Sequence, residues 1–202
     1  MDKEHNLSIL EPHLHIPAID WNLLNEAYKY YSNLYNYLET PFLIPKKYTD
    51  YTKPHKNNSF LLNQEDFREQ PHELVGSAEQ GFIYLLLNNR IKQKKYFSIT
   101  PCFRAERYDE THQPWFMKLE LFHLSSDKQD LENMIQESMS FFSSKDVVPQ
   151  LEQTSINSYD ILINNIEIGS YGFRDIEQYR FIYGTGLALP RFSIAKQEKN
   201  NG

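Results

Sequence analysis

The segment SITPCFRAERYDETHQPWFMKLELFHL, residues 98–124, decides how we interpret this chain. Two apolar runs, KYFSITPCF and WFMKLELFHL, are rich in aromatic and branched residues and are separated by the polar RAERYDETHQP. Such runs on either side of a polar connection predict an antiparallel hairpin with a long loop. Because alternate side chains of a strand share a face, we expect Phe116, Lys118 and Glu120 to project together, away from an apolar face.

An exposed ring flanked by a cation and a carboxylate suits the floor of a site for a flat, charged ligand. The ring of Phe116 can stack on a base, and the ions of Lys118 and Glu120 can fix polar groups. Arg104, at the end of the partner strand, can hold a phosphate through two N–H groups. The alternative is a solvated outer face with a Lys–Glu pair, and this strand alone leaves both interpretations open.

Composition limits the classes of protein to consider. A chain of 202 residues with 40% hydrophobic residues is long enough for one domain with a substantial core. A formal charge of -6 argues against general binding to polyanions. The single cysteine, Cys102, fits a reducing interior, and no signal peptide or long apolar run is readable, so we expect a cytoplasmic protein without a membrane partner.

Helical spacing of apolar residues predicts three long helices. The first covers 20–39 with Asp20 as its cap and runs into the proline-containing extended segment TPFLIPKKYTDYTKP. The second covers SAEQGFIYLLLNN with Ser77 as its cap. The third covers 126–142, with Ser126 and Gln129 as a capping box.

The sequence pattern of the C-terminal part predicts two further strand regions. YDILINNIEIGSYGFR reads as two strands joined at Asn164-Asn165, and FIYGTGLALPRFSIA as a strand, a glycine-bearing turn and a short helix. The fold class is therefore α+β, an antiparallel β-sheet flanked by helices. We expect an N-terminal arm over 1–19, one catalytic domain over 20–195 and a disordered tail over 196–202.

The stretch YGTGLALPR places Gly184 and Gly186 shortly before Arg191. Glycines allow a ligand to approach the backbone closely, and an arginine one turn into a helix can contact a phosphate. An ordinary strand-to-helix turn is the alternative for this short pattern.

In combination, CFRAE, HQPWFMKLEL, EIGSYGFR and YGTGLALPR resemble, in this order, the catalytic core of class II aminoacyl-tRNA synthetases. The Arg-x-Glu strand, loop and Phe strand are similar to motif 2, and G-x-G ending in Arg is similar to motif 3. The helix ending in ETPFLIP stands where motif 1, the dimerisation element, belongs. YFSITPCFRAE and LVGSAEQ look most like the seryl branch, and DETHQPWF looks like the phenylalanyl and aspartyl-lysyl branches.

The resemblance implies a role for each matching residue in binding ATP, Mg²⁺ and an amino acid. Two arginines are implied to be catalytic: Arg104 on the α-phosphate, and Arg191 against the adenine ring and γ-phosphate. Further implied contacts to the nucleotide come from Glu106 (adenine amino group), Phe116 (stacking), Gly184 and Gly186, and Glu167 with Ser170 (Mg²⁺ and phosphates). The implied substrate-binding residues are Ser77, Glu79, Lys118 and Glu120.

The implied function is ATP-dependent activation of an amino acid as an aminoacyl-adenylate, followed by transfer to tRNA or another acceptor. The implied assembly is a homodimer. The 202 residues leave no room for an anticodon-binding domain, so the acceptor stays open between tRNA, a carrier protein and a small amine. Two alternatives remain: a regulatory paralogue that binds amino acid, ATP or tRNA without chemistry, and a structural subunit of a larger complex.

Overall fold

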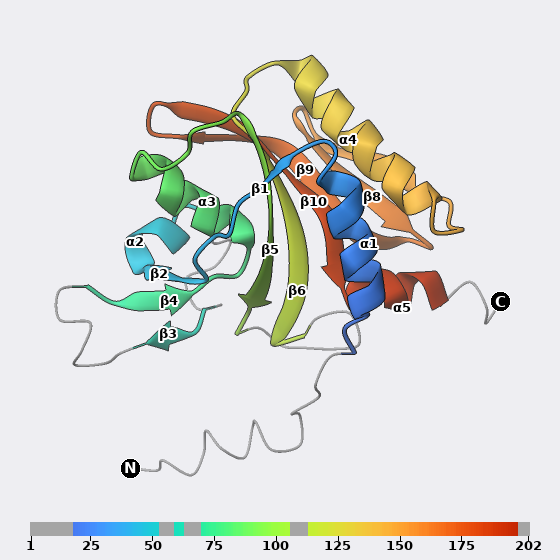
Figure 1. Cartoon of the computed structure of the whole chain (residues 1–202), viewed down its shortest axis with the longest axis horizontal. Helices are drawn as coiled ribbons and strands as arrows, with labels where there is room; N and C mark the ends of the chain where they lie inside the picture. The colour runs from blue at the N-terminus through green and yellow to red at the C-terminus, as the bar shows by residue number, and fades with distance from the viewer. Residues whose placement is uncertain (1–17, 53–58, 63–69, 106–112, 198–202) are drawn as a thin grey trace, which may run out of the picture.

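A computed structural model describes residues 18–52, 59–62, 70–105 and 113–197 of the chain. Its centre is a seven-stranded sheet in the order β1-β5-β6-β10-β9-β8-β7 (Figure 1). The strands of this sheet are β1 (Asn36–Tyr37), β5 (Lys95–Phe103), β6 (Trp115–His123), β7 (Gln150–Ser155), β8 (Ser158–Ile163), β9 (Ile166–Ile176) and β10 (Tyr179–Leu189). All neighbours pair antiparallel except β1, which runs parallel to β5.

The predicted hairpin is formed by β5 and β6. Thr100 pairs with Lys118, and Ser98 pairs with Glu120. Directly paired residues share a face, so these four side chains lie on one side of the sheet. On the other side, Leu119 and Leu121 are fully buried, as the alternation predicts.

Three helices cover the apolar side of the sheet: α1 (Trp21–Tyr31), α4 (Lys128–Ser143) and α5 (Arg191–Gln197) (Figure 1). Each helix brings an apolar stripe onto the strands, because burial of such stripes is the main favourable contribution to folding. Tyr31, Met134 and Phe192 belong to this core together with Leu119 and Leu187.

The opposite side is covered only in part. Helix α3 (Ala78–Leu87) lies there with α2 (Lys46–Thr49) and a three-stranded sheet in the order β2-β4-β3 (Figure 1). The strands of that small sheet are β2 (Leu43–Pro45), β3 (Leu61–Leu62) and β4 (His72–Leu74). Phe82 and Phe122 stack with ring centroids 5.0 Å apart in a second core cluster beneath α3. The rest of this face is accessible to a ligand.

Several predicted elements differ from the structure. The first helix ends at Tyr31 instead of reaching 39, because the chain turns after it and pairs β1 in parallel with β5. The cap of α4 is Asp127, whose side chain accepts the N–H of Gln129, and not Ser126. Strand β7, which the sequence did not suggest, forms one edge of the large sheet.

The predicted glycine turn before the last helix is also wrong. Gly184 and Gly186 lie inside β10, and α5 begins directly after Pro190. A Cβ on Gly184 would lie 2.6 Å from Met134 Sδ, and one on Gly186 would lie 2.5 Å from Leu119 Cδ2. The glycines are therefore needed where the strand packs tightly against the helix-covered core.

Two β-bulges stand side by side in the middle of the sheet. Ile168 of β9 is unpaired between Glu167 and Gly169, and Gly186 of β10 interrupts the pairing between Thr185 and Leu187. A bulge shifts the alternation by one residue and so re-aims the side chains that follow it. The open face of the sheet thereby receives side chains that strict alternation would have turned into the core.

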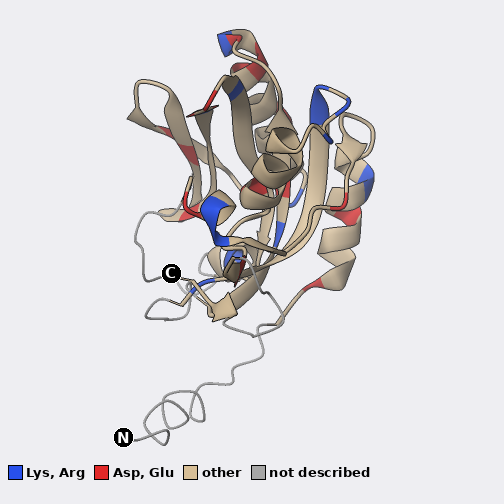
Figure 2. Cartoon of the chain, turned by 90° about the vertical axis from the view of Figure 1, so that its left-hand side faces the viewer, with Lys and Arg blue, Asp and Glu red and all other residues tan. Residues whose placement is uncertain are grey.

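Charges of both signs are mixed over the described surface. In the view of Figure 2, segments with Lys or Arg alternate with segments carrying Asp or Glu. In the described part of the chain, no helix is long and apolar enough to cross a membrane.

Candidate active site

A pocket of about 230 Å³ opens on the uncovered face of the large sheet. Side chains from β6, β9 and β10 and from the start of α5 line it beside Arg104. The predicted site residues that line it are Arg104, Phe116, Lys118, Glu167, Ser170 and Arg191. The structure thus brings together residues that are up to 87 positions apart in the sequence, from 104 to 191.

Arg104 follows directly on β5 and is held in place by two contacts. Its Nε donates to the carbonyl oxygen of Gly76 at 3.2 Å, and its guanidinium carbon lies 5.0 Å from the centre of the Phe116 ring. A guanidinium over an aromatic ring gains a cation–π interaction, and its N–H groups match the geometry of a phosphate.

Arg191 and Glu167 lie next to each other on the lining of the pocket. Nη1 of Arg191 lies 3.6 Å from Oε1 of Glu167, and the Glu167 side chain is 48% exposed. The pair is weak at this distance and exposure, so a phosphate or a cation can compete for either partner.

Ser170 belongs to the same wall and pairs directly with Asp160 of β8. Burial raises the pKa of Asp160, the hydrogen bond from Ser170 lowers it, and the negative charge of Glu167 raises it further. Asp160 was not predicted as a site residue. The Asn164-Asn165 turn would have indicated it, because a two-residue hairpin places Asp160 and Glu167 on one face.

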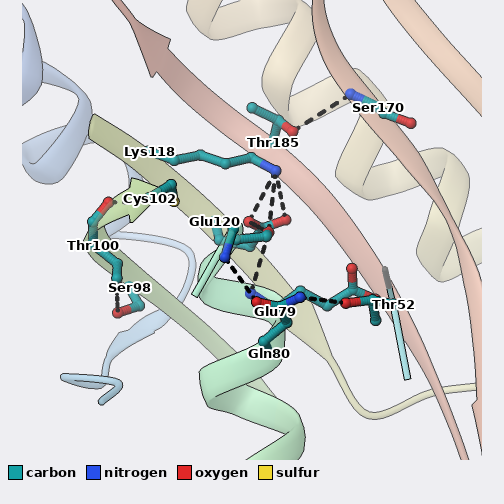
Figure 3. A network of polar contacts seen from close by, with 12 residues as sticks. Thr52, Glu79, Gln80, Ser98, Thr100, Cys102, Lys118, Glu120, Ser170 and Thr185 are labelled. Carbon is teal, nitrogen blue, oxygen red and sulfur yellow. Dashed lines mark hydrogen bonds and ion pairs between the residues drawn. The ribbon is translucent and has the colours of Figure 1, made fainter. Parts of the chain in front are cut away.

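Lys118 and Glu120 form an ion pair beneath the pocket (Figure 3). Nζ of Lys118 donates to Oε1 of Glu120 at 3.0 Å and lies 2.9 Å from Oε2. The hydroxyl of Ser77 donates to Glu120 at 2.5 Å. Glu120 is only 1% exposed and is not among the pocket-lining residues, whereas Lys118 lines the pocket.

Glu79 forms a second ion pair, with Arg174 of β9. Nε of Arg174 lies 2.9 Å from one carboxylate oxygen, and Nη2 lies 3.4 Å from the other. Burial raises the pKa of Glu79, and Arg174 pulls it in the opposite direction. The guanidinium also lies over the ring of Tyr183 at 4.7 Å. No role was predicted for Arg174, which the bulge at Ile168 turns to this face.

Small polar side chains continue the same face behind the ion pairs. The hydroxyl of Thr40 lies 2.9 Å from that of Ser98 and 3.0 Å from that of Thr100. Cys102, next on the strand, is fully buried, and burial raises the pKa of its thiol to about 12. A thiol in this state is neutral and unreactive at physiological pH.

Among the described residues, the predicted site residues that do not line this pocket are Ser77, Glu79, Glu120, Gly184 and Gly186. Gly184 and Gly186 face the helix-covered core. Glu106 lies in 106–112, outside the described residues, as does His112 of the same loop. The predicted domain limits at 1–19 and 196–202 likewise fall largely outside them.

The order of these elements and residues matches a known protein family. Residues 22–150 match the family described as tRNA synthetases class II (D, K and N), which is more than half of the chain. The chain belongs to this family. The resemblance read from the sequence and the α+β fold class are both confirmed. A comparison with curated proteins found no match.

Solved structures of class II synthetases have the same fold. The pyrrolysyl tRNA synthetase PylSc from Desulfitobacterium hafniense aligns with a TM-score of 0.68 at 17% identity, over 96% of this chain and 74% of that one. The seryl-tRNA synthetase from Pyrococcus horikoshii, complexed with ATP, aligns with a TM-score of 0.68 at 17% identity, over 87% and 49%.

The cytoplasmic serine-tRNA ligase from Naegleria fowleri, in complex with AMP, aligns with a TM-score of 0.68 at 15% identity, over 87% of this chain and 47% of that one. The present chain therefore spans about half the length of the two seryl enzymes. These likenesses establish the fold of the synthetase core around the pocket.

Proposed function

We propose that this chain uses ATP to activate an amino acid, or an acid of similar size, as an acyl-adenylate. The observation that carries the proposal is the convergence of Arg104, Phe116, Glu167 and Arg191 on one pocket. Two arginines and an aromatic ring around one cavity suit a nucleotide, because the cations hold phosphates and the ring stacks on the base. The ATP- and AMP-bound seryl enzymes of the same fold support this choice of ligand.

The proposed chemistry depends on positioning and needs no nucleophilic side chain of the protein. The substrate carboxylate oxygen forms a bond to the α-phosphorus of ATP. The bond from that phosphorus to its bridging oxygen breaks, and pyrophosphate leaves with the electron pair. Arg104 holds the α-phosphate, and Arg191 holds the outgoing phosphates, so both stabilise negative charge in the transition state.

The residues present fit Mg²⁺ bound together with ATP. Glu167 and Ser170 supply hard oxygen donors at the pocket, and Asp160 of β8 pairs with Ser170 beside them. No group of three or more His, Cys, Asp or Glu suited to holding a metal occurs among the described residues. That fits Mg²⁺, which keeps several waters and is usually held by one or two carboxylates plus substrate phosphates. When bound, it neutralises phosphate charge.

Transfer to tRNA or another acyl acceptor and assembly as a homodimer complete the proposal. Exposed apolar side chains on α1 and in the segment after it support a self-interface. They are Trp21, Tyr28, Leu34, Tyr37 and Phe42. Sedimentation velocity tests the dimer: Leu34→Glu is expected to shift a dimer to monomers, and a monomeric parent chain contradicts this part.

The activation step is tested by pyrophosphate exchange into ATP with Mg²⁺, across the twenty standard amino acids and related acids. ATP affinity is measured beside it by calorimetry. Arg104→Ala is expected to weaken ATP about ten- to a hundredfold, the usual value of a charge-assisted contact. Arg180→Ala, an exposed arginine paired with Asp175, is the matched control. ATP binding without exchange favours the non-catalytic regulatory paralogue, and unchanged affinity in Arg104→Ala contradicts the pocket assignment.

A further inference from the structure

The guanidinium of Arg104 takes its direction in part from a loop residue. Its Nε donates to the carbonyl oxygen of Gly76 at 3.2 Å, while the backbone N–H of Arg104 donates to Pro114 at 3.0 Å. Gly76 lies in the connection between β4 and α3. An arginine side chain has several rotatable bonds, so a contact that holds it in place before a phosphate arrives favours binding. Any group that fixes Gly76 therefore also acts on Arg104.

Gln80, in the first turn of α3, fixes Gly76. Its Oε1 accepts the N–H of Gly76 at 2.8 Å. Its Nε2 donates to the carbonyl oxygen of Thr49 at 3.3 Å and to the hydroxyl of Thr52 at 3.0 Å (Figure 3). Gln80 is only 4% exposed, and hydrogen bonds are stronger in such an environment than in water. The amide of Gln80 thus ties Gly76 to α2 and the residues that follow it.

These hydrogen bonds differ from ordinary helix capping. In a capping box, the residue three positions after the cap bonds to the backbone N–H of the cap residue itself. The cap of α3 is Ser77, but Gln80 bonds to the N–H of the residue before it, Gly76. A cap alone would stabilise its helix. The contact to Gly76 also connects the start of α3 with the guanidinium of Arg104.

We propose, on the basis of the ATP-binding function inferred above, that Gln80 is a positioning residue for the nucleotide. It holds Gly76 so that the Gly76 carbonyl orients the guanidinium of Arg104 toward the α-phosphate. Thr52 in turn holds the amide of Gln80. Neither Gln80 nor Thr52 lines the pocket. Loss of the Gln80 amide therefore weakens nucleotide binding only through Arg104.

The experiment measures the ATP affinity of the full chain by calorimetry in a double-mutant cycle. Gln80→Met keeps a side chain of similar length and removes the amide. With Arg104 present, we expect this change to weaken ATP about two- to tenfold, the usual value of one hydrogen bond. In the Arg104→Ala background, the same change should cause no further loss, because the residue through which Gln80 acts is gone.

Further variants separate positioning from stability. Thr52→Val removes one acceptor of the Gln80 amide and should weaken ATP by a smaller factor, whereas Thr52→Ser keeps the hydroxyl and should not. Ile83→Val, a fully buried change in the next turn of α3, should lower Tm and leave ATP affinity unchanged. Melting curves are recorded for every variant. If Gln80→Met does not fold, Thr52→Val takes its place in the cycle.

The outcomes separate this inference from the proposed function. Unchanged ATP affinity in folded Gln80→Met overturns the inference and leaves Arg104 in the pocket. Equal losses with and without Arg104 also overturn it, because Gln80 would then act by another route. The same holds if Ile83→Val weakens ATP as much as Gln80→Met does. A parent chain that does not bind ATP, or unchanged affinity in Arg104→Ala, overturns the proposed function and the inference with it.

Discussion

Arg191 and Glu167 form an ion pair on the lining of the candidate pocket, with Nη1 and Oε1 3.6 Å apart. They come from different elements, the start of α5 and the start of β9. Because the pair combines a cation with a carboxylate, the pocket responds in opposite ways to a phosphate and to a cation. A phosphate attracts the arginine and repels the carboxylate, and a cation does the reverse.

Glu167→Gln should therefore change ATP binding in opposite directions with and without Mg²⁺. Without the metal, the variant should bind ATP more tightly, because a carboxylate no longer opposes the phosphates. With the metal, it should bind ATP about tenfold more weakly, the lower end of the usual loss for a group supporting a metal site. Calorimetry in EDTA and in excess Mg²⁺ measures both. Glu132→Gln on the exposed face of α4 is the control, and equal shifts in the two buffers contradict the assignment.

Gly186→Ala tests whether this glycine serves packing. A Cβ there would lie 2.5 Å from Leu119 Cδ2 and 2.9 Å from a ring carbon of Tyr31. Overpacking of this kind costs about 1–3 kcal/mol of unfolding free energy. Denaturant titration without nucleotide measures this loss of unfolding free energy. Gly76→Ala, whose Cβ would meet its first neighbour at 3.5 Å, should cost less. Equal stability of Gly186→Ala and the parent chain would contradict the packing role.

The hairpin of β5 and β6 was predictable because its signal is local. Alternation along nine residues places Phe116, Lys118 and Glu120 on one face, and the structure has them there. Helix α1 was predicted too long because apolar residues continue at helical spacing to Leu38. The end of the helix is decided by the pairing of β1 with β5, whose first pair joins Asn36 to Tyr96, 60 residues further along the chain. This pairing leaves no trace in the local sequence.

The second wall of the site was less predictable than the first. Strict alternation starting at Glu167 would place the side chains of residues 169, 171 and 173 on the pocket side of the sheet. The bulge at Ile168 shifts this set by one, so Ser170 and Arg174 face the pocket side with Glu167. The sequence also gave no reason to pair Glu120 with Lys118 and Glu79 with Arg174 instead of with a ligand. Those pairings depend on side-chain packing across β6, β9 and α3.

Asp160→Asn should raise stability and lower activity. The pKa of Asp160 is raised chiefly by burial, so the folded chain binds the proton more tightly than the unfolded chain does. Its contribution to the unfolding free energy therefore falls as pH rises through the interval between the two pKa values. At neutral pH, removal of the charge should raise Tm, and loss of a donor should weaken Mg²⁺-dependent exchange about tenfold. Asp175→Asn, an exposed β9 residue, is the control. A lower Tm in Asp160→Asn contradicts the argument.

His123, at the end of β6, should make the protein less stable in mild acid. Its side chain is 6% exposed, and Nδ1 has no hydrogen-bond partner in the part of the chain that the structure describes. Burial lowers the pKa of His123. The negative charge of Asp130 raises this pKa, and the positive charges of Lys95 and Lys94 lower it further. The contact with Asp130, 3.8 Å from Nε2, is therefore not an ion pair at neutral pH.

The sign of the effect follows from proton uptake. The unfolded chain takes up a proton at this histidine near pH 6.5, the usual value, and the folded chain does so only at lower pH. The stabilising contribution is thus complete above pH 6.5 and is lost as the pH falls toward the folded pKa, with a slope of at most about 1.4 kcal/mol per pH unit. Urea titrations between pH 5.5 and 7.5 should show a shallower slope for His123→Leu than for the parent. Equal slopes would mean that the unfolding equilibrium does not depend on this histidine.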